Sequence, residues 1–129
     1  MASTLGDRIL FTGHVAHREL EGWVAHCAAL VQPSLYEGFG LPPLEAMACG
    51  RRVAVSRTSS LPEVCGAVAT YFDPLDVASM GEALEIVAND SPLEASDSLR
   101  RREWARSFDW EVCAEATQHQ LARAARSGA

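Results

Sequence analysis

Two glutamates flank a glycine-rich turn in the segment SLYEGFGLPPLEAMACG, residues 34–50. Glu37 and Glu45 have seven residues between them, and Gly38 and Gly40 follow the first glutamate closely. A carboxylate only accepts hydrogen bonds, so a pair of them suits a ligand rich in hydroxyl groups, such as ribose or another sugar. Glycine can adopt positive φ and lets the backbone approach a ligand closely. These residue types therefore predict a site for a hydroxyl-bearing ligand beside accessible backbone amides.

The same turn has the features of an anion site. It is expected to join a buried strand to a helix that begins at Pro42 or Pro43, where a missing N–H costs nothing. The free N–H groups and the positive dipole end of such a helix attract phosphate groups. Amides that bind a diphosphate, next to carboxylates that bind hydroxyls, together predict a nucleotide sugar as the ligand.

Other interpretations of these residues stay open. The turn could be purely structural, and Glu45 could merely complement the helix dipole. The two carboxylates could form the acid and base pair of a glycosidase, although that chemistry needs no anion site between them. A serine nucleophile at Ser56, Ser59 or Ser60 would need a base partner, and none is evident.

The elements that must position this turn follow from hydrophobic spacing. Helical periodicity begins at His17, and a later amphipathic helix, 76–89, is expected to turn Met80, Leu84 and Val87 inward. Two further helices, 93–107 and 110–126, are expected to close the fold, the second capped by Asp109. A serine cap begins the short helix in SSLPEVCG, and the three tryptophans are expected in the core or between helices. Short apolar runs predict strands at 8–13, 29–34, 51–56 and 68–72.

Strands that alternate with helices predict an α/β fold. The strands are apolar without clean alternation, which is typical of a parallel sheet covered on both faces. We therefore expect a partial doubly wound, Rossmann-like parallel sheet of about four strands with helices on both faces. Residues 1–129 are expected to form a single domain, with residues 1–6 disordered.

Composition narrows the function classes. The chain has 129 residues, a net charge of -6, and no lysine among its cationic residues, which argues against a nucleic-acid partner. Its one dense basic cluster, Arg100 to Arg102, is expected on a solvated helix face. Four cysteines without zinc spacing predict buried free thiols in the cytoplasm. No apolar run reaches the length of a transmembrane segment.

Several segments resemble one family in order and spacing. They are RILFTGHV, the turn segment itself, SRTSSLPEVCG, YFDPLD and ARSFDWEVCA. Together they resemble the retaining glycosyltransferases of family four, whose GT-B fold has two facing Rossmann-like domains. The C-terminal, donor-binding domain of that family carries the Glu, seven residues, Glu motif. The resemblance covers residues 7–121.

The resemblance implies a role for each motif residue. Glu37 would be the catalytic-site carboxylate that contacts the donor sugar near its reacting carbon, and Glu45 would hold the ribose hydroxyls. His14 and Val15 would meet the base. No metal and no cofactor is implied, because the donor is a nucleotide-diphosphate sugar and the family transfers its sugar to an acceptor hydroxyl without metal chemistry. The sugar and diphosphate would be bound by the backbone amides of Gly38, Phe39, Gly40 and Leu41.

Departures from the family pattern shape the remaining expectations. Arg52 stands where the family usually has proline, and the family's diphosphate-binding arginine and lysine lie in strands that this chain lacks. The chain resembles the last two-thirds of a donor domain, and we expect it to be inactive alone. The parent enzyme is expected in the cytoplasm or at the cytoplasmic face of the membrane.

In the donor domain that this chain resembles, the first predicted strand pairs with a strand that is absent from this sequence, so it needs another partner. Strand 9–12 would lose its native neighbour and would slide onto the second strand, pair in a homodimer, or be completed by another chain. The expected partners are therefore a nucleotide sugar and either the missing N-terminal domain or a second copy. The alternative function is a non-catalytic interaction or remnant module with the same fold.

Overall fold

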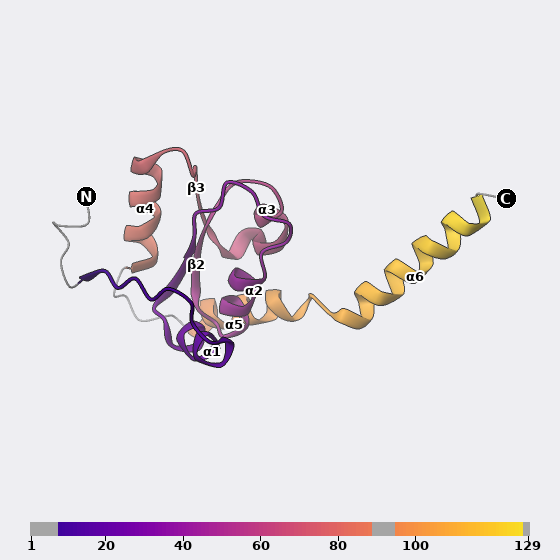
Figure 1. Ribbon diagram of the computed structural model, residues 1–129, viewed down its shortest axis with the longest axis horizontal. Helices are drawn as coiled ribbons and strands as arrows, with labels where there is room; N and C mark the ends of the chain where they lie inside the picture. Colours follow the sequence, from indigo (N-terminus) through magenta and orange to yellow (C-terminus); the bar gives the residue numbers. More distant parts are fainter. Residues whose placement is uncertain (1–7, 89–94, 128–129) are drawn as a thin grey trace.

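The computed structural model describes residues 8–88 and 95–127, and these form an α/β unit with a three-stranded parallel sheet (Figure 1). The predicted disorder of residues 1–6 lies outside the described residues. The elements are α1 (His17–His26), β1 (Ala29–Gln32), α2 (Leu41–Ala48), β2 (Arg52–Ser56), α3 (Leu61–Cys65), η3 (Gly66–Val68), β3 (Thr70–Phe72), α4 (Val77–Ala88), α5 (Ala95–Arg106) and α6 (Trp110–Ser127).

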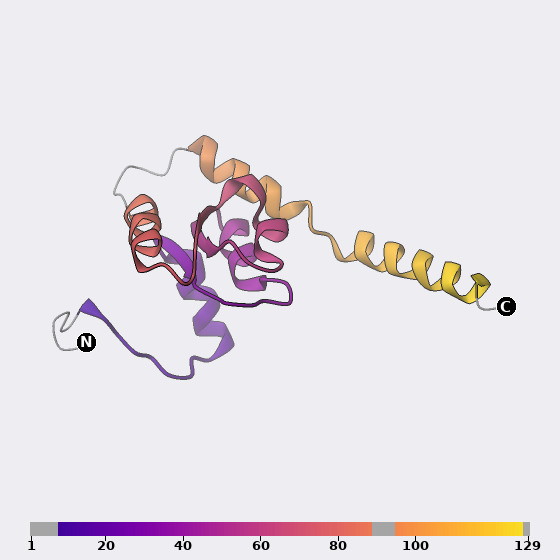
Figure 2. The same ribbon diagram turned by 90° about the horizontal axis from the view of Figure 1, so that it is seen from above.

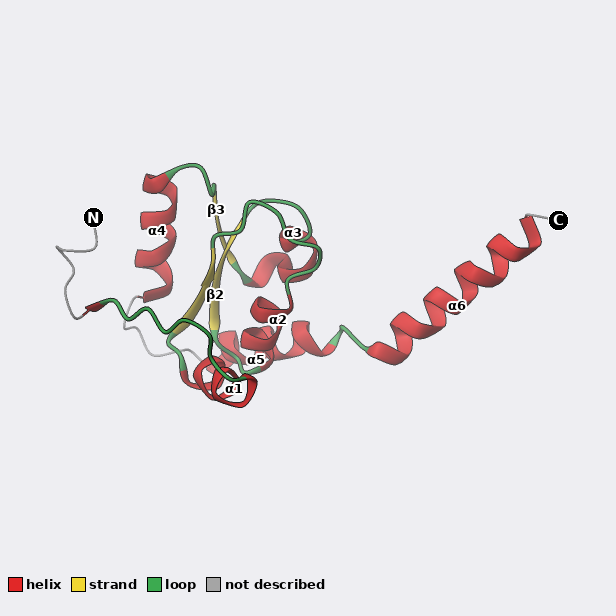
Figure 3. Ribbon diagram, in the orientation of Figure 1, coloured by secondary structure: helices red, strands yellow, loops and turns green. Residues whose placement is uncertain are grey.

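The sheet has the order β1-β2-β3, with all neighbours parallel. Helices cover both of its faces, with α4 on one side and α2, α3 and α5 on the other (Figure 3). Alternate residues of β2 face the two layers: Val53 and Val55 pack with α2 and α3, whereas Ala54 packs with α4. The predicted α/β class and two-sided cover are confirmed.

The larger core lies between β2 and the helices α2, α3 and α5. Met47, Val55 and Leu61 are fully buried there. Burying a side chain of this size stabilises the fold by about 1.5–3 kcal/mol. This core fixes α2 and α3 against the sheet, and the turn before α2 is held in place by both helices.

The strand predicted at 8–13 is not a strand in the structure. Residues 9–13 have no regular secondary structure, and Ile9, Leu10 and Phe11 are exposed. A strand is stabilised by a neighbouring strand and a covered face, and this segment has neither within the described residues. In the described residues the sheet therefore has three strands rather than about four. Val31 of β1 is partly exposed at the edge of the sheet.

The predictions for α4 and for the tryptophans were partly wrong. In α4, Ala83 and Val87 are buried and Met80 packs beside them, but Leu84 is 46% exposed because only a narrow stripe of this helix meets the sheet. Trp104 packs against the core and donates from Nε1 to the Val64 carbonyl at 2.8 Å. The other two tryptophans, Trp23 and Trp110, are exposed.

The last helix does not close the fold as predicted. Asp109 does cap it, accepting a hydrogen bond from the Glu111 amide at 2.7 Å. However, α6 extends away from the sheet in both views (Figures 1 and 2), and residues 110–126 of it are all exposed. None of the helices in the described part of the chain is both long and apolar enough to cross a membrane.

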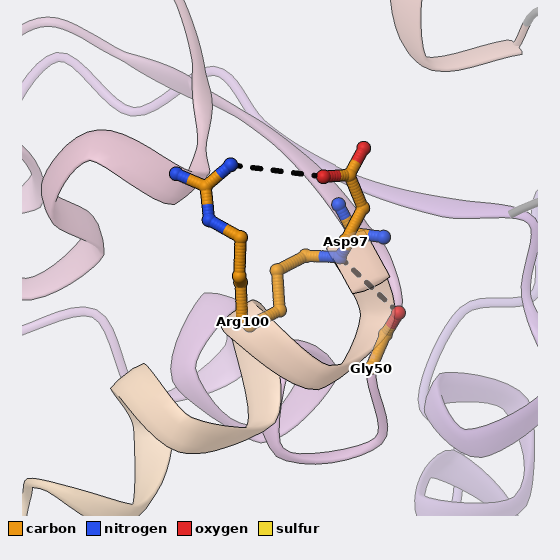
Figure 4. Close-up of polar contacts among 4 residues, drawn as sticks. Gly50, Asp97 and Arg100 are labelled. Carbon is orange, nitrogen blue, oxygen red and sulfur yellow. Dashed lines mark hydrogen bonds and ion pairs between the residues drawn. The ribbon is translucent and has the colours of Figure 1, made fainter. Parts of the chain in front are cut away.

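The basic cluster of α5 is only partly solvated. Arg101 is buried and donates from Nε to the Gly50 carbonyl at 3.2 Å, while Arg100 makes an ion pair with Asp97 at 3.7 Å (Figure 4). Arg102 donates to the Cys49 carbonyl at 3.1 Å. Burial lowers the pKa of Arg101. These bonds satisfy carbonyls at the end of α2, so the cluster ties α5 to α2.

The cysteines differ in accessibility, and this gives a first testable prediction. Burial raises the pKa of Cys65 to about 11, whereas Cys113 on α6 is exposed. Because the thiolate is the reactive form, iodoacetamide at pH 8 is expected to alkylate Cys113 quickly and Cys65 only after unfolding. Peptide mass spectrometry over a time course measures both rates. Equal rates in the folded protein would contradict the buried position of Cys65.

Candidate functional site

The glycine turn lies where β1 ends and α2 begins, at the carboxyl edge of the parallel sheet. Gly40 occupies the N-cap position of α2 with φ of 109° and is buried. An ideal Cβ at this position would lie 2.8 Å from Leu61 Cδ2. Both the positive φ and the close approach of α3 therefore require glycine here.

Four consecutive backbone amides of the turn, at residues 38–41, have no hydrogen-bond partner among the described residues. The next two residues, Pro42 and Pro43, have no N–H to offer, and the Leu44 amide already donates to the Gly40 carbonyl at 3.4 Å. The start of α2 thus presents its free donors in the turn itself, which is the arrangement an anion requires.

Hydroxyl groups from the loop after β2 hold the turn. Thr58 Oγ1 donates to the Ser34 carbonyl at 3.1 Å, and Ser59 Oγ accepts from the Glu37 amide at 2.9 Å. Ser60 Oγ donates to the carbonyls of Glu37 and Phe39, at 3.0 and 2.8 Å. Sequence analysis considered these serines as a nucleophile or a helix cap, and it did not predict these bonds.

Ser60 does not act as the predicted helix cap. It is the N-cap residue of α3, but its side chain makes no capping hydrogen bond. Its hydroxyl is used for the glycine turn instead. The Ser60 hydroxyl, which the local sequence pattern predicts as a cap of α3, therefore binds the carbonyls of a distant segment instead.

The Glu37 carboxylate is half-buried and oriented by two neighbours that sequence analysis missed. Its Oε1 atom accepts hydrogen bonds from Gln32 Nε2 and, at 2.8 Å, from Ser34 Oγ. Within residues 8–88 and 95–127, no donor bonds Oε2. The signal in the sequence was present, because a polar Gln32 ends an otherwise apolar strand and Ser34 lies three residues before Glu37.

Glu45 lies farther along α2 than predicted. The first turn of α2 contains no acidic residue, so Glu45 lies beyond the part of the helix where a carboxylate would complement its dipole. The helix begins at Leu41, with its two prolines inside the first turn. The Glu45 side chain is exposed, and no hydrogen bond or ion pair joins it to a described residue. Complementing the helix dipole therefore does not explain this carboxylate, because that effect is confined to the first turn.

The structure does not bring His14 and Val15 to the glycine turn. They lie just before α1, which occupies the end of the sheet where the strands begin, whereas the turn lies beside α3 at the other end (Figure 1). His14 is exposed and Val15 is partly buried. Because residues 9–12 do not join the sheet, the loop that follows them is not carried to the carboxyl edge.

Two hollows adjoin the turn and its serine loop. One, of about 440 Å³, lies at the ends of β2 and β3, where the Arg57 guanidinium stacks 5.7 Å above the Tyr71 ring and burial raises the pKa of Tyr71 to about 12. The other, of about 380 Å³, is apolar and is lined by Phe39 and Phe108, whose rings meet edge to face with centroids 6.0 Å apart. In the described residues, no three His, Cys, Asp or Glu side chains gather in a way that could hold a metal ion.

Comparison with known proteins places these features in a family. Residues 1–90 match the family model described as Glycosyl transferases group 1. The O-antigen chain mannosyltransferase B of Escherichia coli is 41% identical over 110 residues, which cover 84% of this chain and 29% of that protein. The glycogen synthase of Mycobacterium tuberculosis is 37% identical over 122 residues, which cover 92% of this chain and 29% of that protein.

A solved structure agrees with the family match. Sucrose-phosphate synthase from Thermosynechococcus elongatus superimposes with a TM-score of 0.78 at 29% sequence identity, covering 99% of this chain and 33% of that one. The present chain spans a third or less of the length of these three relatives. The match over residues 1–90 includes the strand, glycine turn and helix on which the sequence resemblance depended. The chain therefore belongs to the glycosyl transferases group 1 family, the GT-B glycosyltransferases that its motifs resemble.

Proposed function

We propose that this chain is the nucleotide-sugar-binding segment of a retaining glycosyltransferase, which moves a sugar from a nucleotide-diphosphate donor to an acceptor hydroxyl. The observation that carries the proposal is the set of unpartnered amides at residues 38–41 beside an oriented carboxylate, Glu37. The family membership and the mannosyltransferase and synthase names of its relatives support glycosyl transfer as the reaction class.

In the proposed mechanism the turn holds the donor diphosphate. The amides of Gly38, Phe39, Gly40 and Leu41 donate to its oxygens. The positive end of α2 lies behind them. As the sugar leaves, negative charge grows on the diphosphate, and donors already aimed at it stabilise the transition state without reorganising. No metal or cofactor is required in this scheme, and Arg57 adds one positive charge on the loop that contacts the turn.

The two glutamates have different parts in this proposal. Glu37 has one oxygen engaged by Gln32 and Ser34, so its orientation is set, and the other oxygen remains to accept from a donor-sugar hydroxyl near the reacting carbon. Glu45, exposed on α2, accepts from the ribose hydroxyls. His14 and Val15 meet the base once the segment before α1 is brought to the carboxyl edge.

The proposal extends to the partners of this chain. Relatives three times as long imply that turnover needs further residues, so we propose that the chain alone is inactive and is completed by an N-terminal domain or a second copy. The free thiols favour a reducing compartment such as the cytoplasm.

A second candidate is a non-catalytic interaction module. The observation that favours it is the exposed apolar segment Ile9–Phe11 together with the fully exposed helix α6. Such surfaces associate readily with another chain, and a homodimer would cover them. Light scattering, combined with the effect of Glu45→Ala on ligand affinity, separates the candidates, because the module predicts a stable dimer whose interface buries Glu37.

Calorimetric titration tests the proposed donor binding. UDP, GDP and ADP and their sugars are titrated into the chain, and at least one is expected to bind. Glu45→Ala removes hydrogen bonds between a charged group and ribose, so it should weaken that binding by about tenfold or more. Glu85→Ala, an exposed glutamate on α4, is the matched control and should leave affinity unchanged. Absence of binding at millimolar concentration by a folded chain would count against the proposal.

A further inference from the structure

Ser60 contacts two carbonyls of the glycine turn with one hydroxyl group. Its Oγ lies 3.0 Å from the Glu37 carbonyl oxygen and 2.8 Å from the Phe39 carbonyl oxygen. Both distances are within the range of O–H···O hydrogen bonds, so the single hydroxyl hydrogen is shared between two acceptors. These two carbonyls belong to the peptide bonds that precede Gly38 and Gly40.

Because of peptide geometry, the contact of Ser60 with these carbonyls also sets the direction of the Gly38 and Gly40 amides. A peptide unit is planar, and in the trans form its C=O and N–H groups point in opposite directions. The described residues contain no cis peptide bond. Because Ser60 draws the carbonyls of Glu37 and Phe39 to one side, the N–H groups of Gly38 and Gly40 must point to the opposite side, away from α3.

Ser59 sets the peptide unit just before these two. Its Oγ accepts the Glu37 amide hydrogen at 2.9 Å, so the amide and carbonyl of Glu37 are bound by adjacent serines. Ser59 has φ of 48°, and it is the one non-glycine residue with positive φ in the described ranges. This conformation is costly for serine and persists where surrounding contacts impose it. The loop that contains Ser59 and Ser60 therefore keeps a strained backbone conformation, and its contacts with the turn stabilise it.

We propose that Ser60 is a positioning residue that holds the Gly38 and Gly40 amides on the same side of the turn, where they donate to oxygens of one anionic ligand. The inference rests on the proposed function for the identity of that group, the donor diphosphate. Ser60 itself does not touch the ligand, since its hydroxyl lies on the carbonyl side of both peptide units. Loss of the hydroxyl frees the two peptide units to rotate, and the two amides no longer point to the same side of the turn.

The amide orientation can be measured without any ligand. Residual dipolar couplings of the Gly38 and Gly40 N–H groups are recorded for the unaltered chain, Ser60→Ala and Ser60→Thr. Ser60→Ala is expected to change both couplings, and Ser60→Thr, which keeps the hydroxyl, to restore them. Thr58→Val is the matched control, because it removes a hydroxyl of the same loop that bonds Ser34 and neither glycine peptide. Unchanged couplings in Ser60→Ala would overturn the proposal.

Binding measurements then separate positioning from general stability. Ser60→Ala is expected to weaken binding of the nucleoside diphosphate by about 5- to 30-fold, which is the effect of one or two lost hydrogen bonds. Binding of the parent nucleoside should be unaffected. Ser60→Thr should bind the diphosphate within about twofold of the unaltered chain. Equal weakening of nucleoside and diphosphate would overturn the positioning role. If the unaltered chain binds no nucleotide while the couplings respond as expected, the proposed function fails and the control of the amides stands.

Discussion

Replacing Phe72 with alanine is expected to lower the free energy of unfolding by about 3–5 kcal/mol. Phe72 is 2% exposed and is the largest buried side chain of the chain's smaller core. Its buried neighbours there are Ala54, Ala83 and Val87, which are too small to fill the space that the ring leaves. The helix α4 is held to the sheet chiefly through this ring, so we expect its contact with the sheet to loosen first.

Urea unfolding followed by circular dichroism measures this effect. Small domains are stable by only about 5–15 kcal/mol, so the Phe72→Ala protein should unfold at a much lower urea concentration. Phe11→Ala provides the control, because that ring is 82% exposed and its loss should change the stability by about 0.5 kcal/mol or less. Equal midpoints for the two variants would contradict the core assigned to Phe72.

Replacing Gly40 with alanine is expected to destabilise the chain by about 1–3 kcal/mol and to abolish anion binding at the turn. The added methyl group would lie 2.8 Å from Leu61 Cδ2, and Leu61 is fully buried and has little room to move. The φ of 109° is itself unfavourable for alanine. The turn should therefore change its conformation, and the Gly38 and Gly40 amides should no longer point to the same side.

Gly38→Ala in the same turn is the matched control. A Cβ at Gly38 would meet no atom within 4 Å, and its φ is not positive. We therefore expect little change in its stability. Amide chemical shifts during a pyrophosphate titration, with urea unfolding of each variant, measure both effects. A Gly40→Ala protein as stable as Gly38→Ala would show that the turn does not need the left-handed conformation.

Local patterns in the sequence predicted the elements of the central sheet and the helix that carries the turn. The apolar run at residues 51–56 predicted β2, and glycines on either side of two prolines predicted where α2 begins and ends. These predictions succeeded because the signals act within a few residues: proline lacks an N–H, and glycine accepts the positive φ found at Gly40 and Gly50. Asp109 capped α6 as predicted for the same reason.

Elements that depend on distant partners were not predictable in this way. Residues 9–12 are as apolar as β2, yet they form no strand, because a strand requires a neighbour that the local sequence does not supply. The burial of Arg101 likewise depends on the Gly50 carbonyl, which is 51 residues away in the chain. Helix α6 has an apolar stripe but packs against none of the described core.

The candidate site shows the same division. The sequence by itself determined which groups are available: two carboxylates, a glycine turn and a helix whose prolines leave the turn amides as its free donors. Only the tertiary structure decided how the turn is held, because Ser59 and Ser60 reach it from the loop after β2. Gln32 and Ser34, which orient the Glu37 carboxylate, lie within five residues of it in the chain. Hydrogen bonds between segments more than 20 residues apart depend on how the sheet brings strand ends together, and that arrangement is a property of the whole fold.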